Sequence, residues 1–200
     1  MHIRYICRSI LSVLLTFIMP LTVLAGEPTE RIKRTTDKLV AIITDPELAA
    51  PEMAEKRNRM LRETVDDVFN WEAFSKRALA IHWKKRTREE QKEFITLFGQ
   101  LLERTYMDKT RHYSGEKLFF LNETIKGDYG VVKAKVVLKN GKEIKVDYRI
   151  KKEEGKWFIY DVYVEGVSLV NNYRVQFNNI ITRSSYEKLI TRLKAKLEER

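Results

Sequence analysis

The chain has 200 residues and carries 38 lysines and arginines against 28 aspartates and glutamates, which gives a formal net charge of +10. Its one cysteine excludes a disulfide framework within the chain, and its length suits a single domain with a full hydrophobic core. The basic balance favours nucleic acid, anionic lipid headgroups or acidic protein surfaces as partners.

The first 25 residues have the pattern of a secretory signal peptide. Arg4 and Arg8 precede an apolar run, Pro20 interrupts that run, and small residues lead up to the bond between Ala25 and Gly26. These are the charged, hydrophobic and cleavage regions of a leader for export. The alternative interpretation is an uncleaved membrane anchor, which the proline and the small-residue site disfavour.

Cleavage after Ala25 would leave residues 26–200 as one exported domain. It would remove Cys7 together with two arginines, so the net charge would fall from +10 to +8 and no thiol would remain. Cys7 precedes the apolar run, so a lipoprotein anchor is not predicted. Export also makes nucleic acid the least suitable partner, and we expect none. No later segment is long and apolar enough to span a membrane.

The N-terminal half of this domain is predicted to be helical. Apolar residues recur with a helical period over residues 29–44 and from about residue 52 to residue 69. Asn70 is placed to cap a third helix. Thr87 and Glu90 have the spacing of a capping box, which opens the clearest helix of the chain.

The pattern then changes to a period of two, which indicates β-strands. Four strands are predicted, over residues 118–125, 130–138, 142–150 and 157–164. Asn140-Gly141 predicts a two-residue hairpin. Further helices are predicted after Ser168 and after a capping box of Ser184 and Glu187. The fold expected is α+β, a four-stranded antiparallel curved sheet with helices packed over one face.

Catalytic and metal-binding motifs are not apparent in the sequence. His82 and His112 have no partner at metal-ligand spacing, so no metal and no cofactor is expected. Asp161 lies among apolar residues of the last strand. A raised pKa there would suit catalysis, and a structural hydrogen bond or ion pair is the simpler interpretation. We therefore expect a protein that is not an enzyme.

One stretch, residues 160–181, carries a family resemblance. The matching positions run from the end of the last strand through a turn into a helix, and are Tyr160, Asp161, Val162, Glu165, Gly166, Val167, Ser168, Leu169, Asn172, Tyr173, Arg174 and Phe177. A second matching block comprises residues 69–79, 82–83 and 91–106. In both blocks the chain resembles the MlaC family, also called the toluene-tolerance family, and the resemblance covers almost all of the chain after residue 25.

The resemblance implies a phospholipid-binding protein of the periplasm. Members carry glycerophospholipids between an outer-membrane lipoprotein complex and an inner-membrane lipid ABC transporter complex, which bears on the lipid asymmetry of the outer membrane. In the family the acyl tails are enclosed between sheet and helices. This implies that the chain has an apolar lipid pocket, with phospholipid as its ligand and the two membrane complexes as its partners.

Apolar patterning alone selects the candidates for contact with the tails. They are Trp71, Phe74, Phe94, Phe98, Leu101, Leu102, Tyr106, Ala134, Val136, Tyr148, Val162, Val167, Leu169, Tyr173 and Phe177. The small residues Gly99 and Ala134 are interpreted as leaving room between sheet and helices. A basic cluster is the candidate for docking on acidic partner or membrane surfaces, and consists of Lys84, Lys85, Arg86 and Arg88.

Three other interpretations remain open at this level. The ligand could be another apolar molecule such as a fatty acid or a hopanoid. The chain could be an enzyme built on a similar curved sheet. It could also be a periplasmic adaptor with a solid core, in which every apolar candidate above is simply buried in the core.

Overall fold

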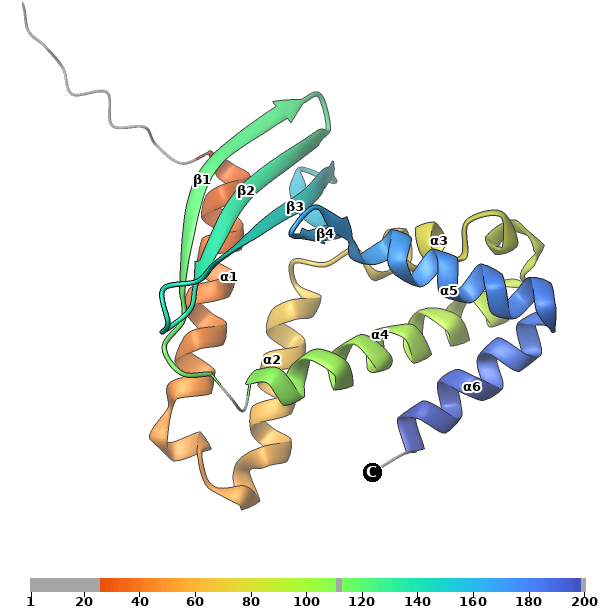
Figure 1. Ribbon diagram of the computed structural model, residues 1–200, viewed down its shortest axis with the longest axis horizontal. Coiled ribbons are helices and arrows are strands. Elements are labelled where there is room, and N and C mark those ends of the chain that lie inside the picture. Colours follow the sequence, from red (N-terminus) through yellow and green to blue (C-terminus); the bar gives the residue numbers. More distant parts are fainter. Residues whose placement is uncertain (1–25, 111–112, 199–200) are drawn as a thin grey trace, which may run out of the picture.

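The computed structural model describes residues 26–110 and 113–198, and the side chains of all of these except residues 106–110. The fold is α+β, with a curved antiparallel sheet and six α-helices in the described part (Figure 1). The helices are α1 Glu27–Thr44, α2 Ala54–Asp66, α3 Trp71–Leu79, α4 Arg88–Thr110, α5 Leu169–Arg183 and α6 Tyr186–Glu198. Short 3₁₀ turns are η1 Pro46–Leu48, η2 Pro51–Met53 and η3 Ala80–Lys85.

The sheet contains five strands in sequence order, where four were predicted. They are β1 Lys117–Lys126, β2 Tyr129–Val137, β3 Glu143–Glu153, β4 Lys156–Val164 and β5 Val167–Ser168. The extra strand arises at the turn after β4, because Glu165 and Gly166 both have positive φ values, +50° and +79°. Two such residues in succession make the tight turn that suits a hairpin, so Val167 returns beside Val164.

The turn between β2 and β3 differs from the two-residue hairpin predicted for Asn140-Gly141. The amide of Leu138 donates to the carbonyl of Lys142 over 2.9 Å, which closes a loop of three residues, 139–141. Gly141 has a φ of +80° and occupies the left-handed position at the end of that loop. The glycine supplies the positive φ that this loop requires, and the loop is one residue longer than predicted.

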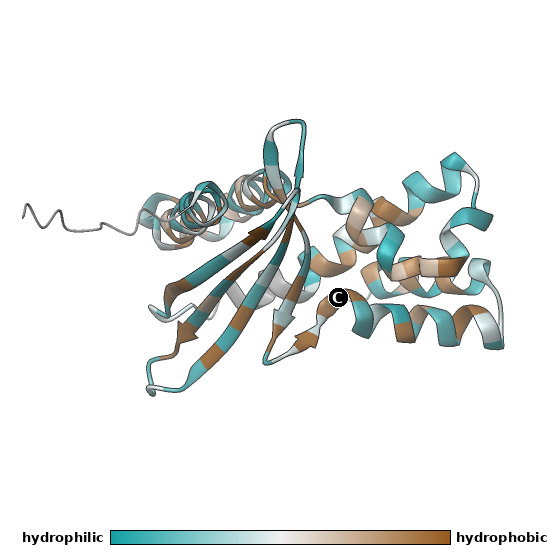
Figure 2. Ribbon diagram, turned by 90° about the horizontal axis from the view of Figure 1, so that it is seen from above, coloured by the Kyte–Doolittle hydropathy of each residue, from teal (hydrophilic) through white to brown (hydrophobic). Residues whose placement is uncertain are grey.

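The strand register separates an apolar face of the sheet from a basic one. Val132, Ala134 and Val136 on β2 lie opposite Tyr148, Val146 and Ile144 on β3. Their neighbours along the chain point to the other side, where Lys133 lies opposite Asp147 and Lys135 opposite Lys145. This confirms the alternation read from the sequence and is visible as bands of brown and teal along the strands (Figure 2).

Helix α1 covers one end of the apolar face. Its Ile32 packs in a buried cluster with Val132, Ile150, Trp157 and Ile159. The start of the helix is tied to the sheet, since the backbone N–H and the hydroxyl of Thr29 both donate to the Glu123 carboxylate, over 3.1 and 2.5 Å. The same carboxylate occupies the place where a side chain on Gly26 would stand.

Helix α2 ends at Asp66, three residues before the predicted end. Val68 and Phe69 leave the helix and pair with Ile159, whose N–H donates to the Val68 carbonyl over 2.8 Å. Phe69 packs against the sheet cluster and also stacks on Trp71, with 5.1 Å between the ring centroids. This short segment therefore joins the sheet to the helical part of the molecule.

Helices α3 to α6 form a second, separate core on the β4 side of the sheet (Figure 1). Phe74, Phe94, Phe98 and Phe177 are at most 3 % exposed and pack ring against ring, with centroid distances between 5.1 and 5.8 Å for their contacting pairs. The molecule thus has a sheet core under α1 and a helical core beside it.

Candidate functional site

The apolar face of the sheet extends from the cluster around Ile32 toward the β2–β3 loop and the β4–β5 turn. The register aligns its side chains in three rows that run across the strands. We call them the apolar rows: Leu118–Val136–Ile144, Phe120–Ala134–Val146–Val164–Val167 and Val132–Tyr148–Val162. All of these side chains point to the same side as the cluster around Ile32, because residues paired across antiparallel strands share a face.

The apolar rows are buried unevenly, because Val132, Ala134 and Val146 are at most 8 % exposed while other members keep accessible surface. Ile150 and Ile159, which pack near Ile32, are 1 % and 2 % exposed. Val136, Tyr148 and Val162 are only half-buried, although they point to the same side of the sheet. Apolar side chains that face inward and still keep accessible surface are available for contact with an apolar ligand.

Tyr148 brings the only hydroxyl to the apolar rows. Among the described residues its phenol has no hydrogen-bond partner, and burial raises the pKa of Tyr148 to about 12. The hydroxyl therefore lies in surroundings that solvate charge poorly, while the side chain keeps part of its surface accessible.

The sequence candidates divide into two groups in the structure. Those on the sheet, Ala134, Val136, Tyr148, Val162 and Val167, all lie in the apolar rows. Ala134 is buried between Phe120 and Val146, and Val167 is exposed at the sheet edge. A side chain added at Gly99 would meet no atom within 4 Å, and that this space lies between sheet and helices stays a prediction.

The candidates on the helices belong to the helical core. Phe74, Phe94, Phe98, Leu101, Leu102 and Phe177 are buried there, with Trp71, Leu169 and Tyr173 packed against them and partly accessible. Tyr173 contacts Phe98 with 5.0 Å between ring centroids. The Tyr106 side chain lies outside the described residues. Contact of these helical residues with acyl tails stays a prediction. Trp71, Leu169 and Tyr173 are the ones that keep surface for such a contact.

Some residues of the apolar rows were not selected from the sequence. Leu118 and Phe120 on β1, and Ile144, Val146 and Val164 on β3 and β4, lie in the rows with the predicted residues. The period of two along each strand was the available signal, and it placed Ile144 and Val146 on the apolar face. For β1 the run of four apolar residues, 118–121, obscured that period.

Asp161 has a structural role. Its Oδ1 accepts from the backbone N–H groups of Val162 and Val170, over 2.8 and 3.1 Å, and its Oδ2 accepts from the Ser168 hydroxyl over 2.6 Å. Ser168 in turn accepts from the N–H of Asn171 over 2.9 Å, so it caps α5 as predicted. The carboxylate therefore fixes the junction between β4, β5 and α5 and is not free to act as a base.

The described residues contain no cluster of three or more histidine, cysteine, aspartate or glutamate side chains that could hold a metal ion. His82 Nε2 lies 2.9 Å from Asn178 Oδ1 and so links η3 to α5. His112 lies outside the described residues. None of the helices in this part of the chain has the length and hydropathy needed to cross a membrane.

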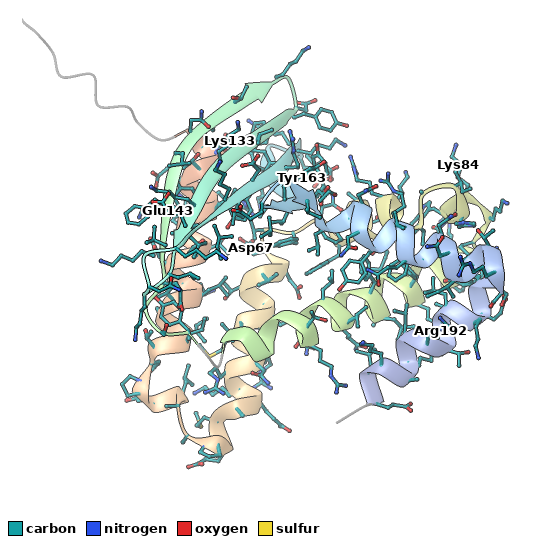
Figure 3. All side chains as sticks on the ribbon, in the orientation of Figure 1. Asp67, Lys84, Lys133, Glu143, Tyr163 and Arg192 are labelled. Atoms are coloured by element: carbon teal, nitrogen blue, oxygen red, sulfur yellow. The ribbon has the colours of Figure 1, made fainter. Side chains whose placement is uncertain are left out.

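The basic cluster proposed for docking lies at the far end of the helical part. Lys84, Lys85 and Arg88 are exposed, and Figure 3 shows Lys84 pointing outward, far from Lys133 on the sheet. Arg86 is different, because its guanidinium is 3.2 Å from Glu90 and 4.4 Å from the centre of the Tyr186 ring. Three of the four residues are thus free for an approaching surface, and Arg86 supports the fold.

Comparison with known proteins agrees with this architecture. The model of the family described as "MlaC protein" matches residues 33–195. The intermembrane phospholipid transport system binding protein MlaC of Haemophilus influenzae is 23% identical over 187 residues, which cover 90% of this chain and 87% of that protein. The structure of a phospholipid-binding protein from Ralstonia solanacearum, solved in complex with a phospholipid, superposes with a TM-score of 0.76 at 23% identity, covering 86% of this chain and 98% of that one. The chain belongs to the MlaC family.

Proposed function

We propose that this protein is a periplasmic carrier of glycerophospholipids. The observation that carries the proposal is the set of apolar rows, in which Val136, Tyr148 and Val162 share the face of the buried core and keep accessible surface, next to a separate, well-packed helical core. The relatives support it as well, since one is named for intermembrane phospholipid transport and another was solved with a phospholipid bound.

The energetics of a diacyl lipid require an enclosed site. Its tails expose roughly 30 methylenes, and at about 0.8 kcal/mol each the cost of leaving them in water is on the order of 24 kcal/mol. Covering half of them would still leave about 12 kcal/mol. A carrier that diffuses through water must therefore shield most of both tails. We assign this task to the buried and half-buried residues of the apolar rows, and not to Val164 and Val167, which are exposed at the sheet edge.

The cellular setting follows from the first 25 residues and from the family. Cleavage after Ala25 would release residues 26–200 into the periplasm, where the carrier would meet an outer-membrane lipoprotein complex and an inner-membrane lipid ABC transporter complex. The exposed Lys84, Lys85 and Arg88 are the groups that we assign to docking on acidic surfaces there.

The decisive experiment is to identify what the protein carries. The full chain is exported in a bacterial host, purified without detergent and extracted with organic solvent, and the extract is analysed by mass spectrometry. We expect phospholipid near one molecule per protein. A fatty acid or hopanoid in its place would support the alternative ligands, hydrolysed lipid would support an enzyme, and an empty protein would contradict a carrier.

Two adjacent valines on β2 provide a matched test of the site. Val136 lies in the apolar rows and Val137 lies on the opposite face, opposite Lys117 and Glu143, while both are half-buried. Val136→Asp should abolish lipid retention, because a carboxylate would then face the acyl tails. Val137→Asp should retain the lipid. Equal lipid content in the two variants would remove the apolar rows from the binding site.

A further inference from the structure

The middle apolar row shows a gradient of exposure from the interior to the edge of the sheet. Ala134 on β2 is 1 % exposed and Val146 on β3 is 8 % exposed, whereas Val164 on β4 is 45 % and Val167 on β5 is 62 % exposed. The register makes these residues consecutive neighbours on one face. An unbroken apolar track therefore leads from the buried part of the site to solvent at the β5 edge.

This outer end of the track is held in place. The N–H of Glu165 donates to the Lys145 carbonyl over 2.9 Å, and the Glu165 carboxylate accepts from the Lys145 N–H. On the other side, the Asp161 carboxylate anchors Ser168. The turn between β4 and β5 is thus held by hydrogen bonds at both ends and is not a free flap. We call this turn, from Val164 to Val167, the lip.

The space beside Gly166 in this turn is open. A side chain added at Gly166 would meet no atom within 4 Å. The next residue after β5 is Leu169, which is partly accessible and packs against the helical core. Sheet edges are usually protected by charged side chains, but the pair that ends this sheet, Val164 and Val167, is apolar on both strands.

We propose that the Val164–Val167 lip is the portal over which acyl chains enter and leave the site. The inference rests on the proposed carrier function and adds the route of exchange to it. A tail that slides along Val167 and Val164 keeps contact with apolar surface as it leaves the buried rows, so fewer methylenes are in water at the highest point of the barrier. The lip therefore controls the rate of exchange, and the interior rows control affinity.

The first test measures exchange and occupancy separately. The protein is loaded with a phospholipid that carries a fluorescent acyl chain, and transfer to phosphatidylcholine vesicles is followed, a neutral acceptor that avoids charge effects. Val167→Asp should slow transfer about tenfold, which corresponds to about 1.4 kcal/mol of barrier, with unchanged lipid content at equilibrium. Val175→Asp is the matched control, because Val175 is 53 % exposed on α5 and lies outside the rows.

A reversible block gives a second, independent test. The only cysteine of the chain is Cys7, so Val167→Cys in residues 26–200 offers one thiol for a bulky label attached through a disulfide. We expect the label to stop transfer and reduction to restore it, whereas the same label on Val175→Cys should have no effect.

Unchanged transfer in both Val167 variants would overturn the portal. Loss of bound lipid in Val167→Asp would also overturn it, since Val167 would then belong to the binding wall. If the unmodified protein takes up no phospholipid at all, the carrier function fails instead, so the two hypotheses fail by different results.

Discussion

The buried carboxylate of Asp161 and the hydroxyl of Ser168 share a hydrogen bond of 2.6 Å, and this contact joins the last long strand to the start of α5. The same carboxylate accepts from the N–H groups of Val162 and Val170. One side chain thus satisfies a strand amide, a helix cap and an amide in the first turn of the helix. These hydrogen bonds explain why an aspartate stands at position 161 in an otherwise apolar part of the strand.

Asp161→Ala should destabilise the fold strongly. It would leave three donors without an acceptor, two of them in buried hydrogen bonds, and each buried loss costs about 1–3 kcal/mol. We expect the free energy of unfolding, measured with urea, to fall by several kcal/mol. Asp161→Asn is the matched variant, because its Oδ1 can still accept from both backbone amides and its Nδ2 can donate to Ser168. Equal losses in the two variants would contradict this account of the junction.

Gly166 is required for its backbone conformation. Its φ of +79° lies in the left-handed region, and no neighbouring atom opposes a side chain. Gly166→Val should therefore lower stability by about 1–2 kcal/mol through backbone strain alone, as a decrease in the urea midpoint. Gly166→Asn should lose clearly less, since asparagine tolerates this region. If valine and asparagine behave alike, strain is not the cause.

Gly99 should give the opposite result. It lies inside α4, where a Cβ would meet no atom within 4 Å. Because glycine is less favourable than alanine in a helix by about 0.8–1.0 kcal/mol, Gly99→Ala should raise the melting temperature. A loss of bound lipid in this variant, measured by mass spectrometry, would show in addition that the open space at Gly99 belongs to the ligand site.

Tyr148 should make stability depend on pH in alkaline solution. Burial raises the pKa of this phenol to about 12 in the folded state, above its usual value near 10 in the unfolded chain. Below pH 10 the phenol is neutral in both states and Tyr148 does not lower the free energy of unfolding. As the pH rises from 10 toward 12, the phenol ionises in the unfolded chain before it ionises in the folded one, so the free energy of unfolding falls. Tyr148→Phe should unfold less readily than the parent between pH 10 and 12.

At neutral pH the same variant should be nearly neutral in stability, since the hydroxyl has no hydrogen-bond partner among the described residues. Tyr186 is the comparison. The pKa of Tyr186 is also raised to about 12, through burial and the nearby charges of Glu90 and Glu93, and its hydroxyl donates to the Glu90 carbonyl over 3.1 Å. Tyr186→Phe should lose stability at neutral pH. A parallel loss in Tyr148→Phe would mean that its phenol has a partner.

The basic cluster should affect encounter rather than folding. Reversing Lys84, Lys85 and Arg88 to glutamate should slow lipid transfer to membranes that contain the partner complexes, most strongly at low salt, because exposed charges are screened beyond about 8 Å at physiological ionic strength. Bound lipid and melting temperature should stay unchanged. Arg86→Glu should instead lower the melting temperature, since Arg86 pairs with Glu90 and covers Tyr186. Normal transfer by the triple variant would place docking elsewhere.

Local signals in the sequence predicted the features that depend on local chemistry. Asn70 accepts from the Ala73 N–H over 2.7 Å, and Thr87 and Glu90 exchange both bonds of their capping box. The box predicted at Ser184 is wrong by one residue, because Ser185 accepts from the Lys188 N–H and Ser184 ends α5. Two adjacent serines offer the same cap, and the choice between them depends on where the preceding helix stops.

Features that depend on distant partners could not be predicted in this way. Val68 and Phe69 continue the apolar period of α2, and only the pairing with Ile159 removes them from the helix. In the same way, periodicity selects Phe94 and Phe98 together with Val136 and Tyr148. It cannot separate a side chain that fills the helical core from one that keeps accessible surface on the sheet, because that difference arises when the two cores pack side by side.

The contact between Glu123 and the start of α1 links the proposed cleavage point to the sheet. The Glu123 carboxylate occupies the position of a side chain at residue 26, so a larger residue there would displace this flexible carboxylate and disturb its hydrogen bonds to Thr29. Residue 26 is also the first residue after the bond that we propose for cleavage. A change of residue at the proposed new N-terminus would therefore reach β1, almost a hundred residues away along the chain, through the Glu123 carboxylate.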